Sequence, residues 1–88
     1  MRILKWQIGI GNERTLEMPK GSKVLDVQMQ GDDCCLWAMC PKDVPIEPRT
    51  FVTYVTGQSI DKSLAQTYVS TFQLHKAGLV FHVFENTN

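Results

Sequence analysis

The chain has 88 residues, with nine basic and nine acidic side chains and a formal net charge of zero. This length suffices for one small domain, residues 1–88, which buries roughly two-thirds of its unfolded-chain surface. The balanced charge disfavours a nucleic-acid partner, because proteins that bind DNA or RNA usually carry a basic stripe. No stretch approaches the ~18 apolar residues of a membrane-spanning helix, and the first residues lack the apolar core of a signal peptide. We therefore expect a soluble cytoplasmic protein without a membrane partner.

Short runs that alternate apolar and polar side chains recur along the chain, which is typical of β-strands joined by turns. The first half predicts strands over residues 2–8, 14–18, 23–30 and 34–40. In the third strand, Leu25, Val27 and Met29 are expected to share one face, opposite Val24, Asp26, Gln28 and Gln30. The fourth, Cys34–Cys40, is apolar on both parities, which favours a central strand covered on both faces. If the chain covers only one of these faces, a second subunit has to cover the other.

The second half begins with three prolines within residues 41–48, where we expect an exposed loop rather than a strand. Further strands are predicted over residues 49–57, 68–75 and 79–85, and residues 61–66 suit at most one helical turn. Ala77-Gly78 is expected to form a two-residue turn, which pairs His75 with Val80 and Gln73 with His82. Alternation then sorts the last hairpin into an apolar face (Phe72, Leu74, Leu79, Phe81, Val83) and a polar and aromatic face (Thr71, Gln73, His75, Val80, His82, Phe84).

About seven closely spaced strands leave no room for crossover helices, so their connections have to be mostly antiparallel. The predicted fold class is therefore all-β, either a small antiparallel β-sandwich or a partly open barrel. Cys34, Cys35 and Cys40 lack the spacing of a zinc site, so we expect small buried side chains in a reducing compartment. No metal and no cofactor are expected.

The two histidines are the only candidates for acid–base chemistry. His75 and His82 share a face in the predicted register, but as diagonal neighbours rather than as a pair, and no carboxylate lies near them in the sequence. Neither begins the His-x-Thr or His-x-Ser pattern of two-histidine phosphodiesterases. We therefore expect no catalytic residue and no enzyme. The alternatives for His82 are a hydrogen bond to Gln73 or a ligand contact.

Other candidates for ligand binding each have a structural alternative. The segment Thr56-Gly-Gln-Ser59 leaves a strand with free backbone donors that suit a phosphate or a ribose, although the same residues form ordinary turns. Arg49 suits a phosphate through its planar guanidinium, or is a solvated strand residue. Trp6 and Trp37 are suited either to the core or to stacking on a nucleobase.

Several segments of the chain resemble a small domain-of-unknown-function family that is common in bacteriophages, prophages and plasmids. The resemblance covers nearly the whole chain and is carried mainly by Thr15-Leu-Glu-Met-Pro-Lys-Gly21, Leu36-Trp-Ala38 and Leu79-Val-Phe-His-Val-Phe-Glu85. The chain departs from the family at Val55-Thr-Gly-Gln58, where relatives tend to have Gly-Thr-Gly-His, and at Tyr68-Val-Ser-Thr71, where they tend to have Tyr-x-Gly-Thr. The resemblance implies a phage-like setting, where small proteins without catalytic motifs are often binders that disable a host system.

These observations together predict a phage-encoded, non-enzymatic and homo-oligomeric protein of the host cytoplasm. It would sequester a nucleotide-derived immune signal, such as a cyclic ADP-ribose variant or a cyclic dinucleotide. Trp37 or Tyr54 would stack on the base, Arg49 would meet a phosphate, and polar side chains would bind ribose or base edges. The predicted ligand-binding residues are Trp37, Arg49, Tyr54, Thr56, Gln58, Gln73 and His82. The alternatives are a protein-binding module that blocks a host or phage polypeptide, and a small phosphodiesterase that uses His75 and His82.

Overall fold

Seven strands and one short 3₁₀ turn follow one another in the computed structural model, which describes residues 1–62 and 65–87. The expected all-β class is confirmed. The predicted helical turn over residues 61–66 includes residues 63 and 64, which lie outside the described residues. The elements are β1 (Arg2–Gln7), β2 (Glu13–Pro19), β3 (Lys23–Gln30), β4 (Asp33–Cys40), β5 (Ile46–Val55), β6 (Gln66–Leu74), the 3₁₀ turn His75–Ala77 and β7 (Leu79–Asn86).

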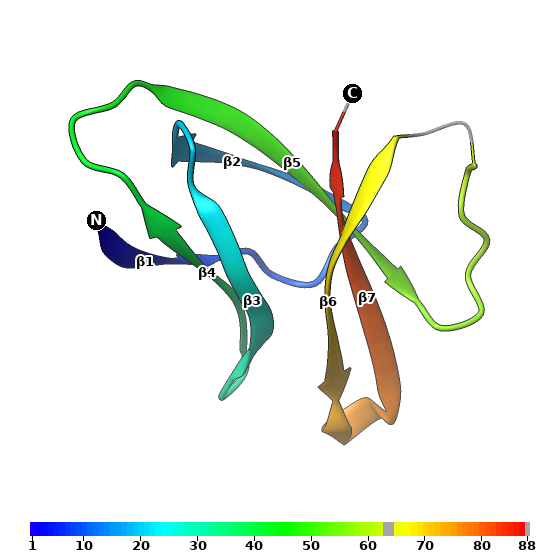
Figure 1. Cartoon of the computed structure of the whole chain (residues 1–88). Coiled ribbons are helices and arrows are strands. Elements are labelled where there is room, and N and C mark those ends of the chain that lie inside the picture. The colour runs from blue at the N-terminus through cyan, green and yellow to red at the C-terminus, as the bar shows by residue number, and fades with distance from the viewer. Residues whose placement is uncertain (63–64, 88) are drawn as a thin grey trace.

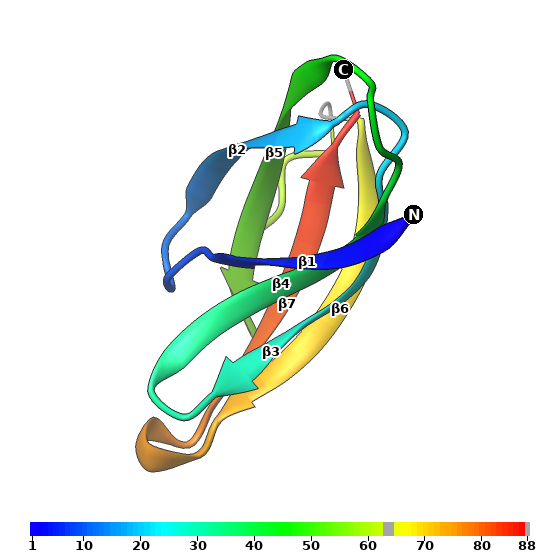
Figure 2. The same ribbon diagram turned by 90° about the vertical axis from the view of Figure 1, so that its left-hand side faces the viewer.

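The strands form two antiparallel sheets that face each other as a small sandwich (Figure 1). One sheet has three strands in the order β1-β4-β3, and the other has four in the order β2-β5-β7-β6. The three-stranded sheet lies in front of the four-stranded sheet in Figure 2. The chain therefore has two outer faces that point in opposite directions.

The core fills the space between the sheets with apolar side chains from both. Leu36 and Ala38 from β4 and Phe51, Phe72 and Val83 from the four-stranded sheet are almost completely buried. Their alternation along each strand is the reason that these strands form, because every second side chain can leave water only on the inner side. Trp6 also packs partly against this core, whereas Trp37 has the opposite parity in its strand.

A polar seam joins the edges of β3 and β6, which run side by side without a strand ladder between them (Figure 2). The buried hydroxyl of Ser70 donates to the carboxylate of Asp26 at 2.6 Å and lies 3.0 Å from the carbonyl oxygen of Val27. The side-chain amide of Gln28 donates to the carbonyl oxygen of Thr71 at 3.2 Å. Side chains thus provide here the hydrogen bonds that paired backbones provide elsewhere in the sheets.

A β-bulge in β3 changes the predicted alternation of that strand. The register with β4 shifts between Val24 and Asp26, so Val24 packs against the core and Leu25 is 46% exposed. The prediction that Leu25 shares a face with Val27 and Met29, opposite Val24, was wrong, because the extra residue of a bulge reverses the parity that precedes it. The bulge also brings Asp26 to the seam with Ser70.

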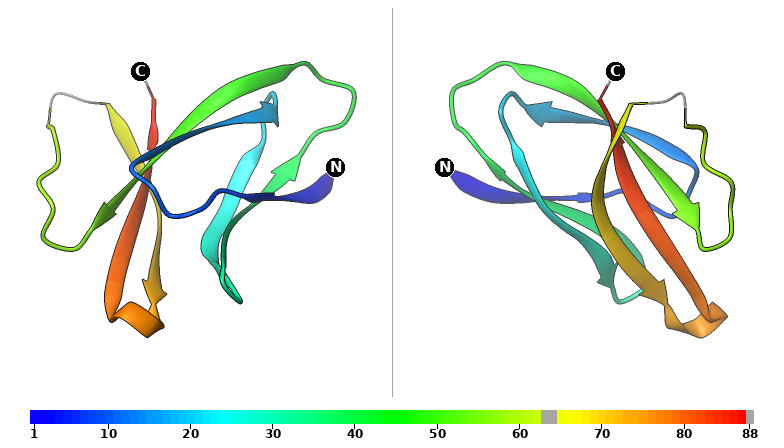
Figure 3. Two further views of the ribbon diagram at one scale, coloured as in Figure 1. Left: turned by 180° about the vertical axis from the view of Figure 1, so that it is seen from behind. Right: turned by 45° about the vertical axis from the view of Figure 1, so that its right-hand side comes forward.

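The hairpin of β6 and β7 has a longer loop than the predicted two-residue turn (Figure 3). Gln73 pairs with Val80 and Thr71 pairs with His82, so four residues, 75–78, connect the strands. A two-residue turn of the favoured type needs positive φ at both central positions, which Ala77 resists, whereas Gly78 adopts a φ of 64°. The register is shifted by two residues, an even number, and the predicted sorting of the two faces is therefore preserved.

The proline-rich segment is a loop only in its first part. The prediction of a loop through residue 48 was wrong, since β5 already begins at Ile46 and Pro48 pairs with Glu17. On the other side of β5, pairing with β7 starts only at Thr50. Proline fits this strand because the side that β7 leaves open requires no backbone N–H.

The three cysteines are free and buried, as predicted from their spacing. Burial is the main cause that raises the pKa of the Cys34 thiol from its ordinary value of 9.0 to about 11, and the neighbouring Cys35 adds to it. The native state therefore holds the proton of Cys34 more tightly than the unfolded chain does.

Because the folded protein binds the Cys34 proton more tightly, we expect the free energy of unfolding to fall as the pH rises. The contribution of Cys34 is fully present below pH 9.0 and is lost as the pH rises to about 11. Chemical unfolding at a series of alkaline pH values checks this, with Cys34→Ala as the variant whose slope in this range is shallower. An unchanged slope in Cys34→Ala would contradict the assignment.

Candidate functional site

The structure brings several predicted ligand-binding residues together on the outer side of the four-stranded sheet. Tyr54, Thr56, Gln73 and His82 all belong to this side, because their positions alternate with the buried residues of the same strands. We call the central part of this surface the aromatic–hydroxyl face and define it by Tyr54, Thr56, Gln66, Tyr68, Thr71, His82 and Phe84.

A chain of hydrogen bonds crosses the aromatic–hydroxyl face. The two ring nitrogens of His82 contact two threonine hydroxyls, with Nε2 2.8 Å from Thr56 and Nδ1 3.1 Å from Thr71. The Thr71 hydroxyl lies 2.8 Å from the phenol oxygen of Tyr68. Imidazole and hydroxyl groups are thereby held in fixed positions across three neighbouring strands. The predicted alternative, a hydrogen bond between His82 and Gln73, is replaced by these two threonine contacts.

Three aromatic rings lie beside this chain. The ring of Phe84 is packed edge-on against both Tyr54 and Tyr68, at centroid distances of 5.8 and 5.6 Å. The Tyr54 ring is buried and its hydroxyl accepts a hydrogen bond from the Gln66 amide at 2.9 Å. Tyr68 is 57% exposed. It is therefore the ring on this face with the largest surface available to a guest.

Tyr68 was missed in the sequence because a bulge in β6 conceals its parity. The register with β7 shifts between Tyr68 and Ser70, so Tyr68 points outward like Thr71 although the two are three positions apart. A strict two-residue alternation would assign them to opposite faces. The signal available in the sequence was the serine at position 70, a small polar residue in an otherwise apolar alternation.

Gln58 and Gln73 lie near the same end of this sheet but on opposite sides of β7, since Val55 and Phe72 both pair with Phe81. The side-chain oxygen of Gln58 accepts a hydrogen bond from the backbone N–H of Val55 at 3.1 Å, which closes the turn after β5. Gln73 is exposed near the β6–β7 loop and lines a cavity of about 280 Å³ together with Gln28, Met29, Thr71, Phe72 and His75. Neither glutamine belongs to the hydrogen-bond chain of His82.

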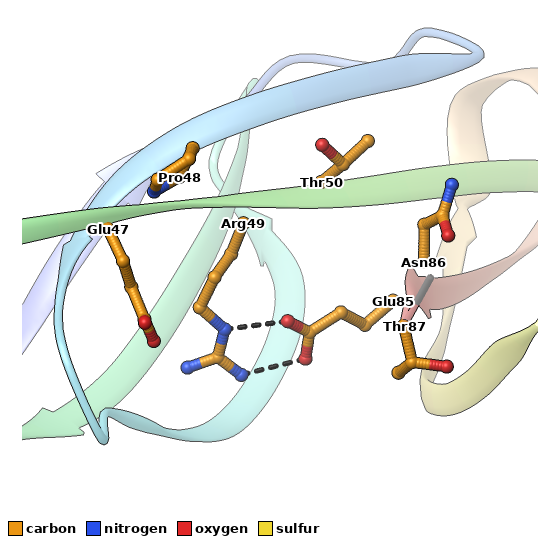
Figure 4. A pocket seen from close by; sticks show the side chains of 7 residues that line it. All are labelled: Glu47, Pro48, Arg49, Thr50, Glu85, Asn86 and Thr87. Carbon is orange, nitrogen blue, oxygen red and sulfur yellow. Dashed lines mark hydrogen bonds and ion pairs between the residues drawn. The ribbon is translucent and has the colours of Figure 1, made fainter.

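Arg49 lies on the inner side of β5, next to a cavity of about 450 Å³ at one end of the sandwich (Figure 4). Its guanidinium donates two hydrogen bonds to the carboxylate of Glu85, at 2.6 and 2.7 Å, and a third to the carbonyl oxygen of Ser22. Figure 4 shows the carboxylate of Glu47 on the other side of the guanidinium. Glu85 is the main cause that raises the pKa of Arg49. The positive charge of Arg49 is therefore already balanced by the carboxylate of Glu85 within the fold.

Trp37 lies on the opposite outer face of the molecule. It belongs to β4 and points away from the core, since Leu36 and Ala38 on either side of it are completely buried. The sandwich separates Trp37 from Tyr54 and His82, so one copy of the chain does not bring all seven predicted residues to one site.

The two histidines do not lie side by side as a pair for acid–base chemistry. Both nitrogens of His82 are occupied by threonine hydroxyls, and His75 lies in the 3₁₀ turn that follows β6. Among the described residues, no three His, Cys, Asp or Glu side chains gather closely enough to hold a metal ion. The groups on the aromatic–hydroxyl face are suited to stacking and hydrogen bonding.

The chain belongs to a family of small domains of unknown function, DUF7352, which matches residues 1–88. The expected membership of an uncharacterised small-domain family is thereby confirmed. No curated protein and no solved structure matches the chain. Within the described part of the chain, none of the elements is a helix of the length and apolarity needed to span a bilayer.

Proposed function

We propose that this protein is a non-enzymatic binding protein that sequesters a nucleotide-derived signal on its aromatic–hydroxyl face. The observation that carries the proposal is the fixed chain Tyr68–Thr71–His82–Thr56 beside an exposed aromatic ring. A nucleobase has a flat face for stacking and polar edges for hydrogen bonding, and these four side chains supply both kinds of contact. Preorganised donors and acceptors lose little entropy when a ligand binds.

The charge of this face indicates which part of the ligand it holds. The two basic residues of β2, β5, β6 and β7 are Arg14 and Arg49, and both have the inner parity of their strands. Phosphates would therefore find no arginine or lysine of these strands beside Tyr68. We infer that the base and ribose are bound and that the phosphates point toward solvent, so affinity should depend only weakly on salt.

The biological setting is part of the same proposal. A phage, prophage or plasmid origin, suggested by the resemblance in the sequence, would place the protein in the cytoplasm of a bacterial host. There, a binder that removes a cyclic ADP-ribose variant or a cyclic dinucleotide would silence a defence pathway. Such a protein would act stoichiometrically, so the captured signal would be recovered intact after heating.

Titration calorimetry with cyclic ADP-ribose variants and cyclic dinucleotides tests the proposal. We expect Tyr68→Ala to weaken binding by about tenfold to a hundredfold, since stacking on an aromatic ring contributes roughly 1–3 kcal/mol per base. Tyr68→Phe is the matched control and should retain most of the affinity, because it keeps the ring. Absence of binding to all these nucleotides would refute the proposal, as would equal affinity of Tyr68→Ala and the unaltered protein.

A protein-binding module is a second candidate, favoured by the acidic edge of the same sheet. Glu13 and Glu17 lie on β2 and point outward like Thr15. Thr15 pairs with Thr50 on β5. Carboxylates without outward arginine or lysine suit a basic protein surface better than a phosphate. A stoichiometric partner from host lysate, together with no response to nucleotides, would favour this candidate.

A further inference from the structure

The loop of residues 8–12 joins β1 to β2, which are the edge strands on the side of the sandwich away from the seam (Figure 2). Among the described residues, no strand ladder joins β1 to β2, and Leu4 and Trp6 on the inner side of β1 remain half-buried. Two cavities, of about 190 and 180 Å³, border this loop, and both reach Thr53. We call the region the glycine-loop site and define it by residues 8–12, Arg14 and Thr53.

The backbone of this loop has hydrogen-bond donors that the fold does not use. The N–H groups of Gly9, Ile10 and Gly11 donate to no backbone or side-chain acceptor in the described part of the chain. Gly9 adopts a φ of 70°, a conformation that other residues rarely adopt. A Cβ atom placed on Gly9 or Gly11 would meet no other atom within 4 Å. Three donors and the open space beside them are therefore available to a ligand.

Arg14 and Thr53 add two side-chain donors to the same site. Arg14 has the inner parity of β2, borders the cavity of about 190 Å³ and makes no ion pair or hydrogen bond with any described residue. Arg49 on β5, by contrast, is paired with Glu85. Thr53 is 9% exposed, yet its hydroxyl makes no hydrogen bond to a described residue. Since every fully buried side-chain oxygen of the described residues has a partner, the Thr53 hydroxyl has to open onto the cavities.

The chemistry of these groups selects an oxyanion with an apolar substituent. A guanidinium, backbone N–H groups and a hydroxyl are donors that hold carboxylates and phosphates in proteins. Ile8, Ile10 and Phe51 add apolar surface to the lining of the larger cavity. Glu13 also borders this cavity, and its carboxylate repels a phosphate dianion more strongly than a carboxylate monoanion. The site is therefore suited to a carboxylate that has an apolar side chain next to it.

Strand β2 has a free edge that begins beside this site. The Thr53 N–H donates to the carbonyl oxygen of Asn12 at 2.9 Å, and in an antiparallel ladder such bonded pairs alternate. Every second residue of β2 therefore directs its backbone groups at β5, whereas Glu13, Thr15 and Glu17 direct theirs at the free edge. A strand added there antiparallel to β2 would end where β2 begins. Its terminal carboxylate would then reach the glycine-loop site.

We propose that the glycine-loop site binds the C-terminal carboxylate of an extended peptide from another protein, which adds a strand to the free edge of β2. Arg14 pairs with the carboxylate, and the loop N–H groups and the Thr53 hydroxyl donate to its oxygens. The added strand also closes the side of the sandwich at which Trp6 remains half-buried. The site shares no side chain with the aromatic–hydroxyl face, so the two surfaces bind their ligands independently.

Affinity selection from synthetic peptide pools tests the proposal. One pool contains short peptides with a free C-terminus and randomised last positions, and the matched pool contains the same peptides as C-terminal amides. We expect the protein to retain peptides with an apolar last residue from the first pool and none from the second. For a retained peptide, amidation should raise the dissociation constant about tenfold to a hundredfold in fluorescence anisotropy, as expected for the loss of charge-assisted hydrogen bonds.

Three single substitutions test which groups hold the carboxylate. Arg14→Gln should raise the dissociation constant about tenfold or more, and Thr53→Val, which keeps the shape of the side chain, about threefold. Gly11→Val should prevent binding because its side chain fills the cavity, and the fold tolerates it because Gly11 does not have a positive φ. Arg2→Gln is the matched control, since it removes the same charge at the far end of β1 and should leave the affinity unchanged.

The same variants separate this site from the nucleotide-binding face. Gly11→Val should still bind any nucleotide of the aromatic–hydroxyl face, and Tyr68→Ala should still bind the selected peptide. The proposal is overturned if the pool with free carboxylates yields no more peptides than the amidated pool. It is also overturned if Arg14→Gln and Gly11→Val, folded as judged by circular dichroism, bind as well as Arg2→Gln. Binding of inorganic phosphate without retention of any peptide would assign the site to a phosphate instead.

Discussion

Replacing Glu85 with alanine is expected to lower the free energy of unfolding by about 2–3 kcal/mol. The side chains of Arg49 and Glu85 are only 18% and 17% exposed, so removal of the carboxylate leaves a guanidinium poorly solvated and without its main partner. The remaining contact with the carbonyl oxygen of Ser22 does not neutralise the charge. Urea denaturation followed by tryptophan fluorescence measures the change.

A double-mutant cycle shows whether the loss comes from the ion pair. Arg49→Met alone should destabilise the protein by a similar amount, because Glu85 then becomes the unpaired charge. The double variant Arg49→Met with Glu85→Leu should be clearly more stable than the sum of the two single losses predicts, since apolar side chains of similar size can replace a buried pair. Additive losses would mean that the two groups act separately.

The ion pair with Glu85 also limits the ability of Arg49 to bind a ligand. In the folded chain, the Nε and Nη2 atoms of Arg49 donate to Glu85 and the Nη1 atom donates to the carbonyl oxygen of Ser22. An anion would have to displace the Glu85 carboxylate, which is held at 2.6 Å in a geometry with two parallel hydrogen bonds. The structure therefore gives Arg49 a role in holding the end of β5 against β7.

Replacing Ser70 with alanine is expected to cost about 1.5–3 kcal/mol, although only one oxygen atom is removed. Ser70 is 5% exposed, and its hydroxyl donates to the carboxylate of Asp26 at 2.6 Å, a kind of hydrogen bond that is among the stronger ones. Without it, the seam between β3 and β6 loses the contact that crosses between the sheets at Asp26. Thermal and urea unfolding measure the loss.

Thr15→Val is the matched control for Ser70→Ala. It also removes a single strand hydroxyl, but the bond between Thr15 and Thr50 is exposed to water. Its effect should stay within about 0.5 kcal/mol, as for most surface substitutions. If Ser70→Ala costs no more than Thr15→Val, the seam does not contribute to stability in the way proposed.

Periodicity in the sequence was enough to place seven strands along the chain and to sort the two faces of the last hairpin. Alternation places Phe72 and Val83 inside and His82 outside without any knowledge of neighbouring strands, because a strand side chain points to one side or the other. The hairpin of β6 and β7 kept this sorting even though its loop was longer than expected. Its register, however, depends on the conformation that Ala77 and Gly78 can adopt.

Only the tertiary structure decided which of the predicted site residues meet. Trp37 and Tyr54 both have the right chemistry for stacking, but they belong to different sheets and therefore point to opposite sides of the sandwich. The pairing of Arg49 with Glu85 was equally inaccessible, because 36 residues separate them along the chain. Local alternation fixes the side of a strand, whereas the order of strands in the sheets depends on long-range packing that no short sequence window contains.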